Sequence, residues 1–165
     1  MENENIQHQH HQSKDLGNLQ KSQGRRAVVS LMTSDYYLDG ARVLGHTLRQ
    51  LQNIPDDVEM LLLYPPEKLS SKTLCYLENT PWILKPIKLI PTPPDPQGRQ
   101  PLDSFADMFT KLAVWNMTEY DALLYLDLDT IATAPLHAIF DMNVDFAAVS
   151  LWNSSARMRL FDHLL

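Results

Sequence analysis

Two aspartates separated by one residue, Asp127 and Asp129, have the side-chain types and spacing in this chain that most directly suggest chemistry. They follow an unbroken apolar run over residues 122–126, which is typical of a strand buried on both faces in a helix-covered sheet. Carboxylates inside such a core would be costly to desolvate. We therefore expect them to emerge at the carboxyl end of the strand, where open α/β sheets place their ligand crevice.

Carboxylates that converge at the rim of a crevice are suited to a hard divalent cation. Alternation along an extended chain sends Asp127 and Asp129 to one side and Leu128 to the other. Their oxygen atoms are the ligands that Mg2+ and Mn2+ prefer. The alternative is a structural role, because acidic residues after strands commonly cap turns or helices and Asp-x-Asp also arises by chance.

Length and composition indicate one ordinary globular domain. Residues 1–26 of the 165 contain few apolar residues and no aromatic ones, so we expect a disordered polar tail there and a folded domain over residues 27–151. The net charge of -6 argues against nucleic acid as a partner. No stretch approaches the roughly 20 apolar residues of a membrane span, and no apolar signal core is visible. We expect a soluble, cytoplasmic chain.

Strand and helix patterns alternate along the domain. Apolar and β-branched runs predict strands over residues 27–32, 58–64, 82–89, 122–126 and 145–150. Helical spacing predicts three intervening helices, marked by Ala41, Leu44, Leu48 and Leu51, by Leu69, Leu74 and Leu77, and by Phe105, Met108, Phe109 and Leu112. This order predicts a mostly parallel sheet with helices on both faces, and with the strand over 122–126 at its centre.

Turn and cap signals separate these elements. Residues 33–35 provide capping side chains before the first helix, and Pro65-Pro66 opens the second. Ser104 and Asp107 have the spacing of a capping box for the third, after a proline-rich loop over residues 86–101. Gly40 and Gly45 weaken the first helix, which indicates close packing where they lie.

Four stretches of the chain resemble the nucleotide-binding half of glycosyltransferase family 8, the family of glycogenin and galactinol synthase. They are residues 29–45, Phe109-Thr-Lys-Leu112 with Trp115, Tyr125-Leu-Asp-Leu-Asp-Thr130, and Pro135-Leu136 with Phe140-Asp141. The spacing of sixteen residues between Lys111 and Asp127 also agrees with the family pattern. Together these stretches favour a functional site over a structural role for the two aspartates. A nucleotide-binding domain of another kind is disfavoured, because no glycine-rich phosphate loop is present.

The resemblance implies a GT-A fold and the transfer of a sugar from a UDP-sugar donor with retention of configuration, in a reaction that depends on Mn2+, with Mg2+ as the alternative. A carbohydrate, a polyol or a protein would be the acceptor. Asp127 would contact both the ribose and the metal, and Asp129 would be a metal ligand. The metal would offset the charge that develops on the nucleoside diphosphate leaving group. No catalytic residue is assigned.

The resemblance also implies contacts to the nucleotide base after the first strand. Leu31 and Thr33 match positions that contact the base, and Ser34 stands where the family often has asparagine. Tyr37 matches the aromatic residue that stacks on uracil. The alternative for Tyr37 is an ordinary core or surface aromatic residue.

Three further residues match the sugar and phosphate side of the site. Lys111 matches a lysine near the donor sugar and diphosphate, with a solvated helix residue as the alternative. Arg99 lies near the position of a phosphate-binding arginine. The backbone of Leu128, where the family often has alanine, would face the ribose.

The family pattern continues with segments that cannot be matched here, including a histidine that is the third metal ligand. Asn153-Ser-Ser155 lacks the glycine of one such segment, and His163 lies too early to be that histidine. Residues 152–165 therefore depart from the family, and the resemblance predicts a truncated fold. A non-catalytic module that binds UDP or pairs with a partner is the alternative function. We expect self-association through an exposed sheet surface.

Overall fold

The computed structural model describes residues 24–51, 53–94, 96–98, 107–142 and 144–149. Its elements are strand β1 (Arg26–Leu31), 3-10 helix η1 (Asp35–Tyr37), helix α1 (Leu38–Arg49), strand β2 (Glu59–Tyr64), 3-10 helix η2 (Pro66–Lys68), helix α2 (Ser71–Leu77), strand β3 (Ile83–Pro86), 3-10 helix η4 (Met108–Asn116), strand β4 (Ala122–Tyr125) and helix α3 (His137–Phe140). Residues 1–23 of the predicted tail and all of residues 152–165 lie outside the described residues.

The four described strands form one sheet in the order β3-β2-β1-β4, and every pair is parallel. In the register, Val29 of β1 pairs with Leu61 of β2 on one side and with Tyr125 of β4 on the other. All carboxyl ends therefore meet at the same edge of the sheet. The predicted parallel α/β sheet is confirmed.

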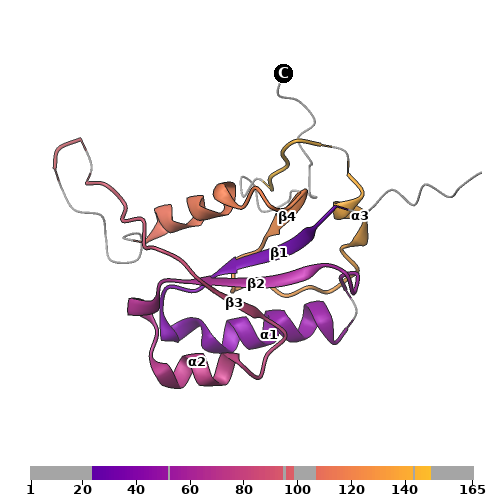
Figure 1. Ribbon diagram of the computed structural model, residues 1–165, viewed down its shortest axis with the longest axis horizontal. Helices are drawn as coiled ribbons and strands as arrows, with labels where there is room; N and C mark the ends of the chain where they lie inside the picture. Colours follow the sequence, from indigo (N-terminus) through magenta and orange to yellow (C-terminus); the bar gives the residue numbers. More distant parts are fainter. Residues whose placement is uncertain (1–23, 52, 95, 99–106, 143, 150–165) are drawn as a thin grey trace, which may run out of the picture.

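Helices cover both faces of the sheet. Figure 1 shows α1 and α2 on one face and the orange helix η4 on the other. Alternate residues of β1 serve the two cores, because Val28 packs on the face of α1 while Ala27 and Val29 pack on the face of Met117. None of the described helices is long and apolar enough to cross a membrane. This Rossmann-like layering is the one that the resemblance to the GT-A fold predicted.

The two glycines of α1 lie where the helix is closely packed, as their positions predicted. A Cβ atom built on Gly45 would lie 2.8 Å from Nε1 of Trp82 and 3.2 Å from a ring carbon of Pro81. The same indole nitrogen donates a hydrogen bond of 2.7 Å to the carbonyl oxygen of Ala41. A Cβ atom on Gly40 would overlap the carbonyl oxygen of Leu128. The helix thus contacts the segment before β3 at one glycine and the segment after β4 at the other.

Strand β4 differs from its prediction in position and in burial. Within the described sheet it is an edge strand that pairs only with β1, and its four residues are half-buried. The predicted strand over residues 145–150 is also wrong in its described part, because residues 144–149 form no strand. Phe146 and Val149 are exposed there, 65% and 60%. An apolar run indicates a strand but does not show which neighbour pairs with it.

The third predicted helix is present as η4, but most of the apolar residues that marked it are exposed. Met108, Phe109 and Leu112 are exposed, whereas Thr110 and Met117 are buried. η4 is a 3-10 helix, whose three residues per turn bring different side chains together than an α-helix would. The helix also begins without the predicted capping box. Asp107 is its N-cap residue but makes no side-chain cap, and its carboxylate instead pairs with Lys68 at 2.7 Å. Ser104 and Phe105 lie outside the described residues.

The first predicted helix ends earlier than expected, and the second is divided into two shorter helices. Helix α1 ends at Arg49, so Leu51 lies beyond it and is exposed. The predicted second helix is divided into η2, with Pro66 in its first turn, and α2, which Ser70 caps by accepting a hydrogen bond from the Thr73 amide. The predicted strand over 82–89 shortens to β3, which is an edge strand ending at Pro86 as that proline predicted.

A charged cluster joins the start of β2 to the segment before β4. Glu59 accepts hydrogen bonds from Arg25 at 2.8 Å and from the Tyr120 hydroxyl at 2.8 Å. The Arg25 guanidinium also lies over the Tyr120 ring, 4.4 Å from its centroid. These hydrogen bonds, that of Arg25 first, lower the pKa of Glu59. The stabilisation that Glu59 adds to this cluster is therefore greatest while Glu59 is ionised.

We expect the stabilisation from Glu59 to disappear in acid. A carboxyl whose pKa is lowered by folding contributes stability above its unfolded pKa, about 4.3, and loses that contribution as the pH falls through the folded pKa. Glu59→Gln should therefore lower the melting temperature at pH 7, and the difference from the unsubstituted chain should shrink at pH 3. Thermal unfolding at pH 3, 5 and 7 measures this. A difference that is the same at all three pH values would contradict the prediction.

Candidate functional site

The predicted site residues converge because β1 and β4 are parallel neighbours. The amide of Leu126, just after β4, donates to the carbonyl oxygen of Val29 at 3.0 Å. The buried hydroxyl of Ser30 donates to the carbonyl oxygen of Leu126 at 2.8 Å. These bonds fix the chain after β4 beside the end of β1. The loop that begins at Leu31 and the turn that holds the two aspartates therefore start from adjacent points of one edge.

The two aspartates lie on a turn over residues 127–130. The amide and the hydroxyl of Thr130 both donate to the carbonyl oxygen of Asp127, at 3.2 and 2.6 Å. Leu128 is 5% exposed and belongs to the core that contains α1, while Asp127 and Asp129 are exposed. Both carboxylates thus emerge from the core, as expected, and Leu128 lies on the other side of the chain from them; its burial in the core was not predicted. The backbone achieves this with a turn, not with a continued strand.

Asp127 is the centre of a small polar network. Its Oδ1 atom accepts from Nζ of Lys111 at 2.6 Å and from the hydroxyl of Tyr125 at 3.1 Å. The Lys111 ammonium also lies 5.4 Å from the centroid of the Tyr125 ring. Burial, followed by the charge of Asp127, raises the pKa of Tyr125. Its hydroxyl therefore remains a hydrogen-bond donor at neutral pH.

Lys111 reaches this network because η4 is fixed at its start. The hydroxyl of Thr110, fully buried, accepts from the amide of Ile90 at 3.0 Å and lies 3.2 Å from the carbonyl oxygen of the same residue. This joins η4 to the segment that follows β3. The spacing that the resemblance singled out, from Lys111 to Asp127, thus corresponds to a direct ion pair.

Two of the residues predicted to contact the nucleotide base, Ser34 and Tyr37, lie at the start and the end of η1. Ser34 caps this short helix by accepting from the amide of Tyr36 at 3.2 Å. Asp35 accepts from the amide of Ser70 at 3.0 Å, which ties η1 to the start of α2 and lowers the pKa of Asp35. Tyr37 is 42% exposed and makes an edge-to-face contact with Tyr36, 5.3 Å between ring centroids. The alternative that Tyr37 is a core residue is therefore excluded.

Of the remaining predicted site residues, three can be placed in the structure. Leu31 and Thr33 are half-buried at and after the end of β1. Leu128 connects the two sides, because its carbonyl oxygen lies against Gly40 in the first turn of α1. Arg99 lies outside the described residues.

A divalent cation fits the donors that the two aspartates present. No cluster of three or more acidic, histidine or cysteine side chains that could hold a metal occurs in the described part of the chain. Mg2+ is often held by one or two carboxylates together with substrate phosphates, so two exposed aspartates on one turn satisfy that pattern. Only Oδ1 of Asp127 has hydrogen-bond partners among the described residues. Within that part of the chain, no hydrogen bond is made to its Oδ2.

Tyr125, Ser30 and Thr130 were not among the predicted site residues, although they fix the position of Asp127. A signal for Tyr125 was present, because it lies two residues before Asp127 and alternation puts both on one side of the strand. No comparable signal marks Ser30, whose contact with Leu126 spans 96 residues of sequence.

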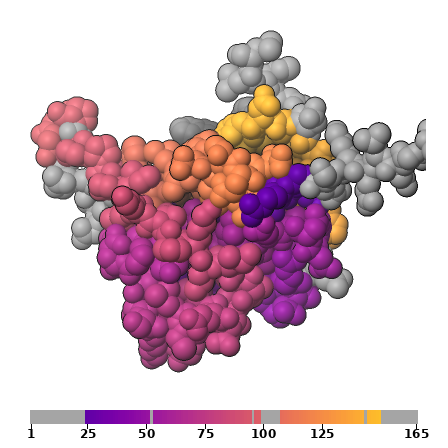
Figure 2. Space-filling view, in the orientation of Figure 1, coloured from indigo at the N-terminus to yellow at the C-terminus, as the bar shows by residue number. Residues whose placement is uncertain are grey.

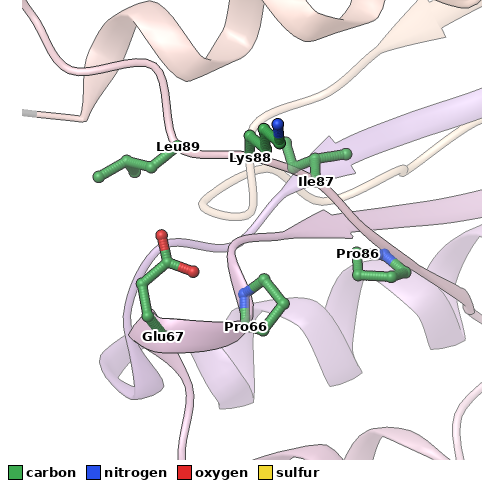
Figure 3. A pocket seen from close by; sticks show the side chains of 6 residues that line it. All are labelled: Pro66, Glu67, Pro86, Ile87, Lys88 and Leu89. Carbon is green, nitrogen blue, oxygen red and sulfur yellow. The ribbon is translucent and has the colours of Figure 1, made fainter.

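An open depression of about 480 Å3 lies at the same edge of the sheet, between the segments that follow β2 and β3. Figure 3 shows its lining by Pro66 and Glu67 on one side and by residues 86–89 on the other. None of the predicted site residues that the structure describes lines it. It therefore adds no contact to the site around Asp127. The segment after β3 continues outward from it and projects from the body of the molecule (Figures 1 and 2).

Comparison with known proteins shows similarity to several glycosyltransferases. The chain is 27% identical over 134 residues to a glycogenin of Neurospora crassa, which covers 77% of this chain and 18% of the relative. It is 28% identical to inositol phosphorylceramide glucuronosyltransferase 1 of Arabidopsis thaliana, over 75% of this chain and 22% of the relative. It is 32% identical to a putative UDP-glucuronate:xylan alpha-glucuronosyltransferase 4 of the same plant, over 68% of this chain and 19% of the relative.

Among solved structures, the apo form of the glycosyltransferase GlyE of Streptococcus pneumoniae matches 82% of this chain and 32% of its own, at 22% identity and a TM-score of 0.46. No family model matches the chain. The chain spans about a fifth of the length of these curated relatives. The relatives nevertheless confirm the resemblance that the four sequence stretches indicated, and this chain is related to the glycosyltransferases of family 8, glycogenin among them.

Proposed function

We propose that this chain forms the nucleotide-binding part of a glycosyltransferase that takes a sugar from a UDP-sugar donor. The observation that carries the proposal is the turn with Asp127 and Asp129, which presents two exposed carboxylates at the carboxyl edge of a parallel sheet. Such an edge is where open α/β sheets bind ligands. The name of one relative, which includes UDP-glucuronate, supports the same class of donor.

Asp127 and Asp129 would hold Mn2+, or Mg2+ as the alternative. When bound, the cation supplies positive charge that offsets the charge developing on the diphosphate leaving group. The carboxylates suit this task because their neighbour Leu128 is anchored in the core, which holds the turn in place.

Each protein group of the site has a role in the proposed binding of the donor. Tyr37 stacks on the uracil ring, with Leu31, Thr33 and Ser34 beside it. Lys111 exchanges its ion pair with Asp127 for one with the diphosphate, because lysine binds phosphate oxygens by charge-assisted hydrogen bonds. Arg99 would bind phosphate. Transfer would retain the anomeric configuration, with a carbohydrate, a polyol or a protein as acceptor.

Isothermal titration of UDP tests this function. We expect binding in Mn2+ that becomes much weaker in chelator, because the diphosphate would then face the two carboxylates without the cation between them. Asp129→Asn should abolish most of this metal dependence without changing the melting temperature, since an exposed carboxylate contributes little to packing. Asp56→Asn is the matched control, because Asp56 is an exposed aspartate between α1 and β2.

Equal affinity for UDP in Mn2+ and in chelator would contradict the metal role. An equal loss in Asp56→Asn would show that the effect is one of overall charge. A hydrolysis assay with UDP-glucose, UDP-galactose and UDP-glucuronate then identifies the donor. Binding of UDP without hydrolysis of any donor would instead favour a nucleotide-binding module without turnover.

A further inference from the structure

Two donors converge on one oxygen of Asp127, and they differ in how firmly they are held. Lys111 and Tyr125 both donate to Oδ1, at 2.6 and 3.1 Å. The lysine ammonium ends a flexible four-carbon stem and is 43% exposed along its side chain. The Tyr125 ring is rigid, belongs to a strand, and packs against the core that contains Val29 and Met117.

The strand determines the direction from which the tyrosine approaches. Tyr125 pairs with Val29 in the register of β1 and β4, and Leu126 is held by Val29 and Ser30. Both the ring and the start of the turn are thus fixed to the same sheet. The hydroxyl is therefore a fixed point for the Asp127 carboxylate, whereas the ammonium of Lys111 can leave.

We propose that Tyr125 is a positioning residue for the divalent cation, which holds Oδ1 of Asp127 so that Oδ2 of the same carboxylate faces the metal. The proposal rests on the proposed function for the identity of the cation. Hydrogen bonds to a ligating carboxylate fix its orientation, and loss of such a partner typically weakens metal binding about 10- to 100-fold.

The two donors then have opposite effects on the cation. Lys111 carries a positive charge next to the metal position and competes with the metal for the carboxylate until diphosphate arrives. Tyr125 is neutral and orients the carboxylate without competing. Removal of the lysine charge should strengthen binding of the cation alone, whereas removal of the tyrosine hydroxyl should weaken it.

The experiment measures Mn2+ binding without nucleotide, by the electron paramagnetic resonance signal of free Mn2+. Tyr125→Phe keeps the ring and its packing, and we expect it to weaken Mn2+ binding about 10- to 100-fold. Tyr120→Phe is the matched control, because Tyr120 also packs on this core and donates to a carboxylate, that of Glu59 at 2.8 Å. It should leave Mn2+ affinity unchanged. Lys111→Met should strengthen Mn2+ binding.

Unchanged Mn2+ affinity in Tyr125→Phe would overturn the proposal. So would a loss of Mn2+ affinity in Tyr120→Phe as large as that in Tyr125→Phe, and so would weaker Mn2+ binding by Lys111→Met. Melting temperatures of all three variants show whether a loss reflects unfolding. If Tyr125→Phe failed to fold, weaker Mn2+ binding by Lys111→Met would still overturn it. Failure of the proposed function is recognised separately, since a chain that binds Mn2+ but not UDP would refute the donor while leaving the role of Tyr125 intact. A chain that binds no Mn2+ would refute both.

Discussion

Gly40→Ala should weaken Mn2+-dependent binding of UDP roughly 10- to 100-fold, because disturbing the groups that orient metal ligands typically weakens metal binding by that factor. The added Cβ atom would overlap the carbonyl oxygen of Leu128 and lie 3.3 Å from its carbonyl carbon. Both are backbone atoms, so no side-chain rotation can relieve the contact. Either the first turn of α1 or the turn that carries Asp127 and Asp129 must move. Isothermal titration of UDP in Mn2+ measures the effect.

Gly45→Ala is the control for this substitution, because it changes the same residue type in the same helix. Both replacements raise the intrinsic helix propensity by about 1 kcal/mol. The Cβ atom of the control would meet the side chains of Trp82 and Pro81, and among the described residues neither forms a hydrogen bond with the aspartate turn. We expect Gly45→Ala to lower the melting temperature while it leaves UDP affinity unchanged.

Equal losses of UDP affinity in the two glycine variants would show that packing of α1 as a whole is responsible. Unchanged affinity in Gly40→Ala would show that the turn adapts without cost. If only Gly40→Ala failed to fold, its contact with Leu128 would be required for folding and not specifically for the site.

The sheet was predictable because its strands are marked by local patterns. The apolar runs that include Val28, Leu62 and Leu124 are continuous, as parallel strands between two layers of helices require. The exit of Asp127 and Asp129 from the core was predictable for a similar reason, since an unpaired carboxylate is not stable inside one. Both conclusions depend only on residues that are neighbours in the sequence.

The partners of Asp127 could not be predicted in the same way, because they depend on packing between distant segments. The resemblance placed Lys111 in the site, but its ion pair with Asp127 spans 16 residues and requires the position of η4 over the sheet. The sequence also did not show that this helix is a 3-10 helix or that its Met108 and Leu112 are exposed. Tertiary contacts such as that of Thr110 with Ile90 determine both.

Tyr37 and the aspartate turn are joined through the first turn of α1, and each would contact a different part of the nucleotide. Tyr37 immediately precedes α1, and Gly40 in the first turn of that helix contacts Leu128. In the proposed site, Tyr37 recognises the base and the aspartates recognise the metal with its diphosphate. A substitution of Tyr37 should therefore weaken binding of the base, whereas a substitution of either aspartate should weaken binding of the metal with its diphosphate.

We expect Tyr37→Ala to weaken UDP binding roughly 5- to 150-fold, because stacking of a base on an aromatic ring is worth about 1–3 kcal/mol. Tyr37→Ala should weaken binding of uridine, which has no phosphate, by the same factor as binding of UDP. The size of this loss should not depend on Mn2+. Tyr36→Ala is the matched control, since Tyr36 is the neighbouring tyrosine and is 86% exposed. Removal of a partly exposed ring should lower stability by much less than the roughly 3–5 kcal/mol of a core aromatic residue. A large fall in melting temperature with unchanged affinity for UDP and uridine would show that Tyr37 supports the fold, and equal losses in both tyrosine variants would show that the base rests on the pair of rings.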